Sequence, residues 1–188
     1  MTNKNKLNWK EIQKSLLSKD DKIFNAALKK LEKHGENIFL YDIIEIIHKT
    51  SNENRIESLF SFLSRLKNPG AEKNMMEIIK DKKNEKIKAR LLNSFWNSSL
   101  DYTAYFSDFV EFAVHGNYMI ALECLTILEN LKGPFEEKQL LDSQLSLKVH
   151  IENKGKNDEK APLISEIAVF IKNTNQGLSD INQDLYNS

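Results

Sequence analysis

Four apolar residues flank one acidic residue in a pattern that recurs along the chain. It occurs at 43–47 (Ile-Ile-Glu-Ile-Ile), 75–79 (Met-Met-Glu-Ile-Ile) and 109–113 (Phe-Val-Glu-Phe-Ala), with a weaker copy at 140–142 (Leu-Leu-Asp). On an α-helix, which turns about 100° per residue, the four apolar side chains fill one continuous arc and the acidic one points away. The pattern therefore predicts four similar helices, each with a wide apolar face and a narrow polar face.

A second apolar set precedes each of these helices at the same spacing. The first copy comprises Phe24, Ala27, Leu28 and Leu31, and a shift of 32 residues gives Ile56, Leu59, Phe60 and Leu63. Each of the two later copies has one polar residue in place of an apolar one, Lys88 in the third copy and Glu123 in the fourth. The neighbouring Ile87 and Leu122 supply the apolar side chain instead. A fixed spacing of this length is typical of stacked two-helix repeats. We expect Leu28, Phe60, Leu92 and Cys124 to be buried at equivalent places in successive repeats.

These periodicities predict an all-α fold, a right-handed α-solenoid of about four two-helix repeats. The repeats cover about 20–50, 51–82, 83–116 and 117–152, and capping helices cover 8–17 and 162–173. Gly, Pro, Asn and Ser cluster between the periodic segments, where the chain must reverse. We expect residues 1–173 to form a single domain and residues 174–188, rich in Asn, Gln, Ser and Asp, to form a fraying polar tail.

From about residue 20 to residue 151 the chain resembles HEAT-like repeats of the armadillo-type fold. The resemblance rests on paired helices of about 32 residues and on the segment 81–90 (Asp-Lys-Lys-Asn-Glu-Lys-Ile-Lys-Ala-Arg). Armadillo and tetratricopeptide arrays are near alternatives. The resemblance implies a protein-binding scaffold, although a minority of such proteins are DNA-repair glycosylases or bilin lyases. No catalytic motif of those enzymes matches this chain, so we expect a non-enzymatic module, with an unrecognised enzyme of this class as an alternative.

Charge is unevenly distributed although the total is zero, with 27 basic and 27 acidic side chains. Residues 1–100 have a balance of +7 and residues 101–188 a balance of −7. Such a molecule can steer charged partners or associate weakly head to tail. The single cysteine, Cys124, excludes an internal disulfide and fits a reducing compartment. Without a signal-peptide pattern or a long apolar run, we expect a cytoplasmic protein with no membrane span.

Acidic and amide residues of the second helices form the candidate partner-binding site. Glu45, Glu77 and Glu111 occupy the same position in three copies, and a polar residue precedes each by three. Aligned on a concave face, these residues would bind a basic or polar segment of another protein, whereas the simpler alternative is a solvated surface. The complete candidate site is Asp42, Glu45, Asn74, Glu77, Asp108, Glu111 and Asp142.

A basic cluster provides the alternative, weak nucleic-acid binding. Its members are Lys80, Lys82, Lys83, Lys86, Lys88 and Arg90. Clustered cations bind phosphates, but Asp81 and Glu85 interrupt this cluster, and the neutral chain differs from the usual basic binding domain. We therefore prefer a solvated loop here and a protein as the partner.

No residue pattern predicts a catalytic site, a cofactor or a metal. Glu45 and His48 have the Glu-x-x-His spacing of di-iron bundles, but such a site needs a second pair nearby. The closest analogue, Glu111 and His115, has a spacing of four and belongs to another repeat. Aromatic residues are expected to fill the core and the gaps between repeats, namely Phe60, Phe62, Phe95, Trp96, Phe106, Phe109 and Phe112.

Overall fold

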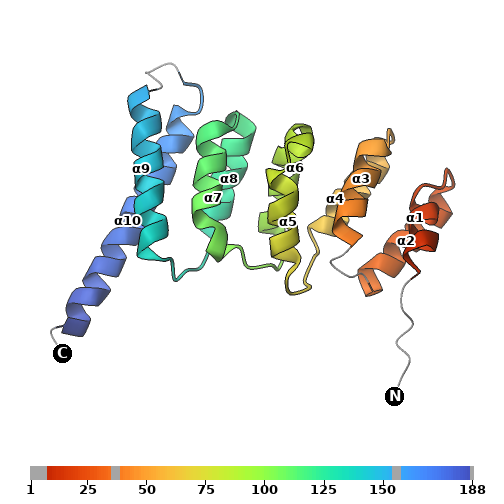
Figure 1. Cartoon of the computed structure of the whole chain (residues 1–188), viewed down its shortest axis with the longest axis horizontal. Coiled ribbons are helices and arrows are strands. Elements are labelled where there is room, and N and C mark those ends of the chain that lie inside the picture. Colours follow the sequence, from red (N-terminus) through yellow and green to blue (C-terminus); the bar gives the residue numbers. More distant parts are fainter. Residues whose placement is uncertain (1–7, 35–38, 154–157, 187–188) are drawn as a thin grey trace. The chain divides into compact units, whose positions relative to one another are not determined.

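The chain is helical throughout the part that the structure, a computed structural model, describes (Figure 1). The described residues are 8–34, 39–153 and 158–186, with side chains described as far as residue 175; within them there is no strand, and the all-α prediction is confirmed. The helices are α1 (Trp9–Leu16), α2 (Asp21–His34), α3 (Leu40–Lys49), α4 (Glu53–Leu63), α5 (Ala71–Lys80), α6 (Lys88–Asn97), α7 (Phe106–His115), α8 (Tyr118–Asn130), α9 (Glu137–Asn153) and α10 (Ala161–Tyr186), with 3₁₀ helices η2 (Lys82–Ile87) and η3 (Thr103–Tyr105).

The chain divides into two compact units, Met1–Leu100 (unit 1) and Asp101–Ser188 (unit 2). This boundary coincides with the change in charge balance, so unit 1 carries the +7 and unit 2 the −7. The third predicted repeat, 83–116, spans the boundary, with α6 in unit 1 and α7 in unit 2. A single domain of four repeats therefore stays a prediction.

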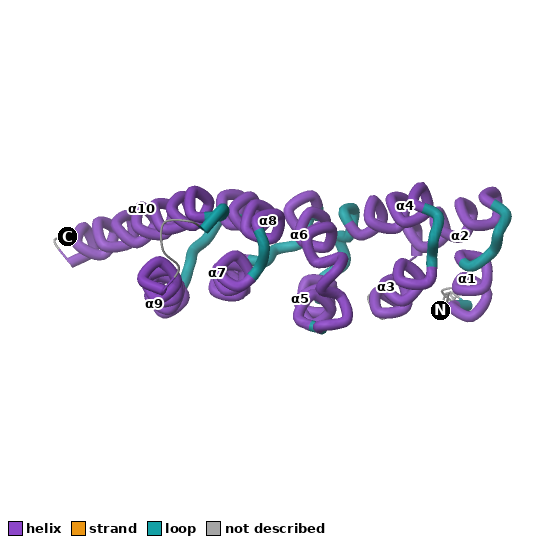
Figure 2. The backbone as a smooth tube through the Cα atoms, turned by 90° about the horizontal axis from the view of Figure 1, so that it is seen from above, coloured by secondary structure: helices purple, strands orange, loops and turns teal. Residues whose placement is uncertain are grey.

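Unit 1 consists of two layers of helices (Figure 2). Helices α2, α4 and α6 pack successively in one layer, α3 and α5 pack together in the other, and α1 packs against α2. Asn52 begins α4 by accepting a hydrogen bond from the backbone N–H of Arg55, which satisfies one of the unpaired donors of the first turn. Most apolar residues of the 32-residue pattern in this unit are buried, including Phe24, Leu59 and Leu92.

Unit 2 has the same layered arrangement. Helices α7 and α9 form one layer, α8 and α10 form the other, and α7 packs against both α8 and α9 (Figure 2). Phe106 is fully buried, with its ring centroid 4.7 Å from that of Phe135. Asn117 begins α8 by accepting from the N–H of Ile120. The outer surface of the α7–α9 layer contains the candidate site described below.

The predicted burial is confirmed at all four positions. Leu28, Phe60, Leu92 and Cys124 have exposed fractions of 7, 6, 0 and 0%, each on the first helix of its predicted repeat. The expectation for aromatic residues is wrong at Trp96, which is 40% exposed. Leu91, Leu92 and Phe95 form the buried face of α6. Trp96, about 100° further round the helix than Phe95, falls outside that face.

Two predicted boundaries differ from the structure. The basic cluster, expected to lie in a solvated loop, instead includes η2, before which the Asp81 carboxylate accepts from the backbone N–H of Lys83 at 3.0 Å. The closing helix, predicted to end at 173, continues as α10 to Tyr186, through most of the segment predicted as a tail. No proline interrupts this polar segment, so its backbone can maintain helical hydrogen bonds.

Candidate functional site

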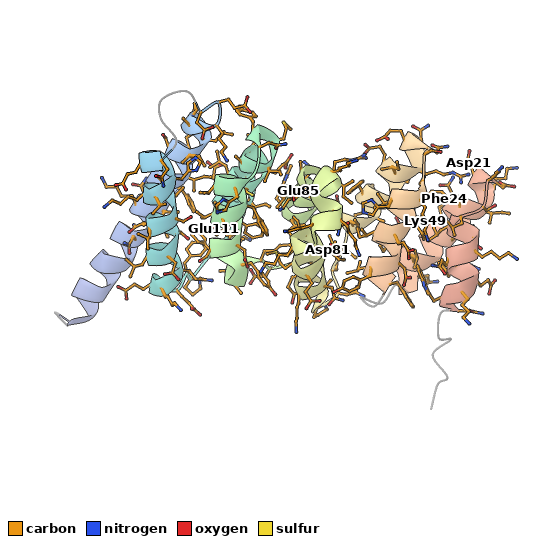
Figure 3. The ribbon with its side chains drawn as sticks, turned by 45° about the horizontal axis from the view of Figure 1, so that its top comes forward. Asp21, Phe24, Lys49, Asp81, Glu85 and Glu111 are labelled. Atoms are coloured by element: carbon orange, nitrogen blue, oxygen red, sulfur yellow. The ribbon has the colours of Figure 1, made fainter. Side chains whose placement is uncertain are left out.

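Glu45 and Glu77, the predicted glutamates of unit 1, are exposed, but each has a partner within the chain. Glu45 accepts a hydrogen bond from Lys49, one turn further along α3, at 2.6 Å (Figure 3). Glu77 of α5 accepts one from the hydroxyl of Tyr41 on α3. Tyr41 and Glu45 are four residues apart and share a helix face, so Glu77 faces the same side as Glu45. The hydrogen bond from Lys49 lowers the pKa of Glu45. The hydrogen bond to Glu77 raises the pKa of Tyr41.

The polar residues three positions earlier are less accessible. Asp42, Asn74 and Asp108 are all half-buried. Burial raises the pKa of Asp42, the charge of Glu45 raises it further, and a hydrogen bond from the Trp9 side chain partly offsets both. The fold therefore disfavours the charged form of Asp42.

In unit 2, two predicted site residues meet at one groove. Glu111 of α7 and Asp142 of α9 both line an open groove of about 520 Å³ between these helices, and Glu111 is labelled in Figure 3. The groove residues are Glu111, Val114, His115, Asp142, Leu145, Ser146, Val149, His150 and Asn153. Its volume is within the range of ordinary ligand-binding clefts.

The groove combines acidic and apolar surface. The Glu111 side chain is about half exposed, and its Oε2 lies 3.1 Å from Nε2 of His115. Val114 is buried, whereas Leu145 and Val149 of α9 are 62 and 48% exposed. A bound segment would thus meet carboxylates beside aliphatic side chains, an arrangement suited to a cation flanked by apolar residues.

Lys160 supports one wall of the groove. Its side chain is buried, and Nζ donates to the backbone carbonyls of Ala113, Val114 and Gly116 at 2.8, 2.6 and 2.6 Å. The last carbonyls of a helix lack internal donors and carry partial negative charge, which an ammonium group neutralises. Lys160 therefore ties the end of α7, including groove residue Val114, to the start of α10.

His150, one of the groove residues, forms a second buried link with Asp158. His150 Nε2 lies 3.0 Å from the Asp158 carboxylate, and both side chains are largely buried. Burial raises the pKa of Asp158, but the Lys160 N–H, the His150 side chain and the Lys160 charge lower it more, so the net pKa is below its usual value. Sequence reasoning missed Asp158 and Lys160 because 153–160 reads as a charged surface loop.

The basic cluster is largely engaged within unit 1. The Arg90 guanidinium lies 4.3 Å from the Phe60 ring centroid and bonds to Glu53 and Glu57 of α4 at 2.8 and 2.6 Å. Arg55 makes a similar contact with α2, where its guanidinium lies 5.0 Å from the ring centroid of Phe24. Phe24 is labelled in Figure 3. Arg90 is therefore a helix-packing residue, which corrects its assignment to a solvated loop.

Other cations of the cluster also have acidic neighbours. Lys88 lies 3.2 Å from Glu85, and Lys83 lies 3.1 Å from Asp81. These pairs reduce the positive charge available to a phosphate backbone. Nucleic-acid binding through this cluster stays an alternative prediction.

The remaining observations concern metal sites, membrane-spanning helices and similarity to known proteins. No three His, Cys, Asp or Glu side chains among the described residues are grouped so that they could hold a metal ion. In that same part of the chain, no helix is both long enough and apolar enough to cross a membrane. The chain matches no family model, no curated protein and no solved structure. Function is therefore inferred from the residues and their geometry.

Proposed function

We propose that this chain is a non-enzymatic, HEAT-like helical-repeat scaffold that binds a basic or polar segment of another protein. In this proposal four two-helix repeats form a right-handed solenoid, and their second helices present acidic side chains on its concave face. The observation that carries the proposal is the α7–α9 groove, where Glu111 and Asp142 line one surface with Val114, Leu145 and Val149.

The two kinds of surface contribute differently to binding. Ion pairs between exposed groups contribute only about 0–1 kcal/mol each, so Glu111 and Asp142 supply selectivity for cations and faster association. Burial of an aliphatic side chain contributes about 1.5–3 kcal/mol. Val114, Leu145 and Val149, the apolar wall of the groove, therefore supply most of the affinity. The excess of acidic residues in unit 2 favours approach of a basic segment.

Peptide display with an unbiased library on the full-length chain tests this function. We expect the selected peptides to be enriched in Lys and Arg next to apolar residues. Binding should be lost in the double variant Glu111→Lys/Asp142→Lys and retained in Glu129→Lys/Glu166→Lys, which changes the charge equally at exposed positions of unit 2 outside the groove. The proposal is wrong if no peptides are enriched or if both double variants bind them equally.

A further inference from the structure

Helix α9 has two apolar faces, although only one is packed in the fold. Leu140 and Leu147 are buried within unit 2, with exposed fractions of 0 and 2%. Leu141, Leu145 and Val149 are about half exposed or more, and they follow one another at intervals of four. Side chains at this spacing form a continuous ridge on a helix, the kind of ridge that fits into the groove of another helix.

The apolar ridge and the acidic residues belong to one surface. Leu145 and Val149 line the α7–α9 groove together with Glu111 and Asp142. The ridge from Leu141 to Val149 is about 12 Å long at about 1.5 Å per residue, a length that two or three turns of another helix would cover. An exposed apolar surface bordered by charge marks a site of interaction.

The apolar wall favours a helical occupant over an extended one. An extended backbone against Val114, Leu145 and Val149 would lose water from its N–H and C=O groups, and these side chains provide no hydrogen bonds in return. No strand in the described part of the chain offers an edge to pair with. A helix satisfies its own backbone and presents only side chains, as in helix-in-groove recognition.

We propose that the α7–α9 groove binds an amphipathic α-helix of a partner protein. The helix lays apolar residues at spacings of three and four along the ridge from Leu141 to Val149, and it places Lys or Arg opposite Glu111 and Asp142. This inference rests on the proposed function and specifies the conformation and side-chain pattern of its ligand.

Two peptide libraries of equal composition test the inference. One spaces apolar and basic residues with a helical period, and the other alternates them with the period of a strand. We expect the full-length chain to select binders from the helical library. In fluorescence anisotropy their affinity should fall about tenfold or more with Leu145→Asp or Val149→Asp and stay unchanged with Val169→Asp, which alters an equally exposed apolar residue of α10.

Several results would overturn the inference. Binders drawn mainly from the alternating library, or helical binders that tolerate both groove variants, would show a different binding mode, while the unbiased selection could still support the proposed function. Dimers seen by sedimentation and abolished by Leu145→Asp would make a second copy of the chain the occupant. If circular dichroism shows one groove variant to be misfolded, the other provides the comparison.

Discussion

Replacement of Lys160 by methionine tests how the end of α7 is held. Methionine preserves much of the apolar stem of lysine and removes the ammonium group. The carbonyls of Ala113 and Val114 then lose a donor within a buried environment, whereas half-buried Gly116 can regain water. Two unsatisfied carbonyls cost about 2–6 kcal/mol. Because burial of the ammonium carried a desolvation penalty that the variant avoids, we expect a net loss of about 2–3 kcal/mol.

Amide hydrogen exchange followed by mass spectrometry measures this loss where it occurs. Both tryptophans, Trp9 and Trp96, lie in unit 1, so tryptophan fluorescence would not report on α7. Peptides from 106–116 should exchange about 30- to 150-fold faster in Lys160→Met, since each 1.4 kcal/mol corresponds to about tenfold. Lys148→Met, at an exposed position of α9, is the matched control. Equal exchange in the two variants would refute the role of Lys160.

Three further substitutions test the packing of unit 1. Leu92→Ala should destabilise this unit by about 2–5 kcal/mol, and an unchanged urea midpoint by tryptophan fluorescence would contradict the repeat register. Arg90→Lys should cost about 1–2 kcal/mol in the same assay, because lysine cannot stack on Phe60 while binding two carboxylates; wild-type stability would show that these contacts contribute little. Asp42→Asn should raise the midpoint at pH 7, since the pKa of Asp42 is raised in the fold and its charge opposes folding above that pKa. The stability advantage of the variant should vanish below about pH 3.8, the ordinary pKa of the group, because Asp42 is then uncharged in both the folded and the unfolded chain. If the variant's urea midpoint at pH 7 is equal to or below that of the wild type, the account of Asp42 is wrong.

The buried faces of the helices were predictable because helical periodicity and burial are directly linked. Apolar residues at intervals of three and four share a face, and the predicted burial of Leu28, Phe60, Leu92 and Cys124 is confirmed. The contact of Arg90 with Phe60 was not predicted, although the same relation joins Arg55 to Phe24. The two arginines lie 35 residues apart and the two phenylalanines 36 apart, outside the spacing of 32, so the repeat pattern did not reveal either pair.

Features of unit 2 depended on tertiary packing. Lys160 turns inward because the end of α7, more than 40 residues earlier in the chain, leaves its carbonyls beside the start of α10. No local pattern distinguishes such a lysine from a solvated one. The spacing of Leu141, Leu145 and Val149 is visible in the sequence, but α9 is apolar on two faces, and periodicity alone does not indicate which face packs in the fold.

Methyl NMR of the full-length chain tests most directly whether the α7–α9 groove is the binding surface. Leucine and valine methyl groups would be labelled, and a peptide selected from the helical library would be titrated into the protein. The groove account predicts the largest shift changes at Val114, Leu145 and Val149, with those of Leu63 and Leu92 in unit 1 unchanged. Changes centred on unit 1, or the same groove changes in Glu111→Lys/Asp142→Lys, would contradict it.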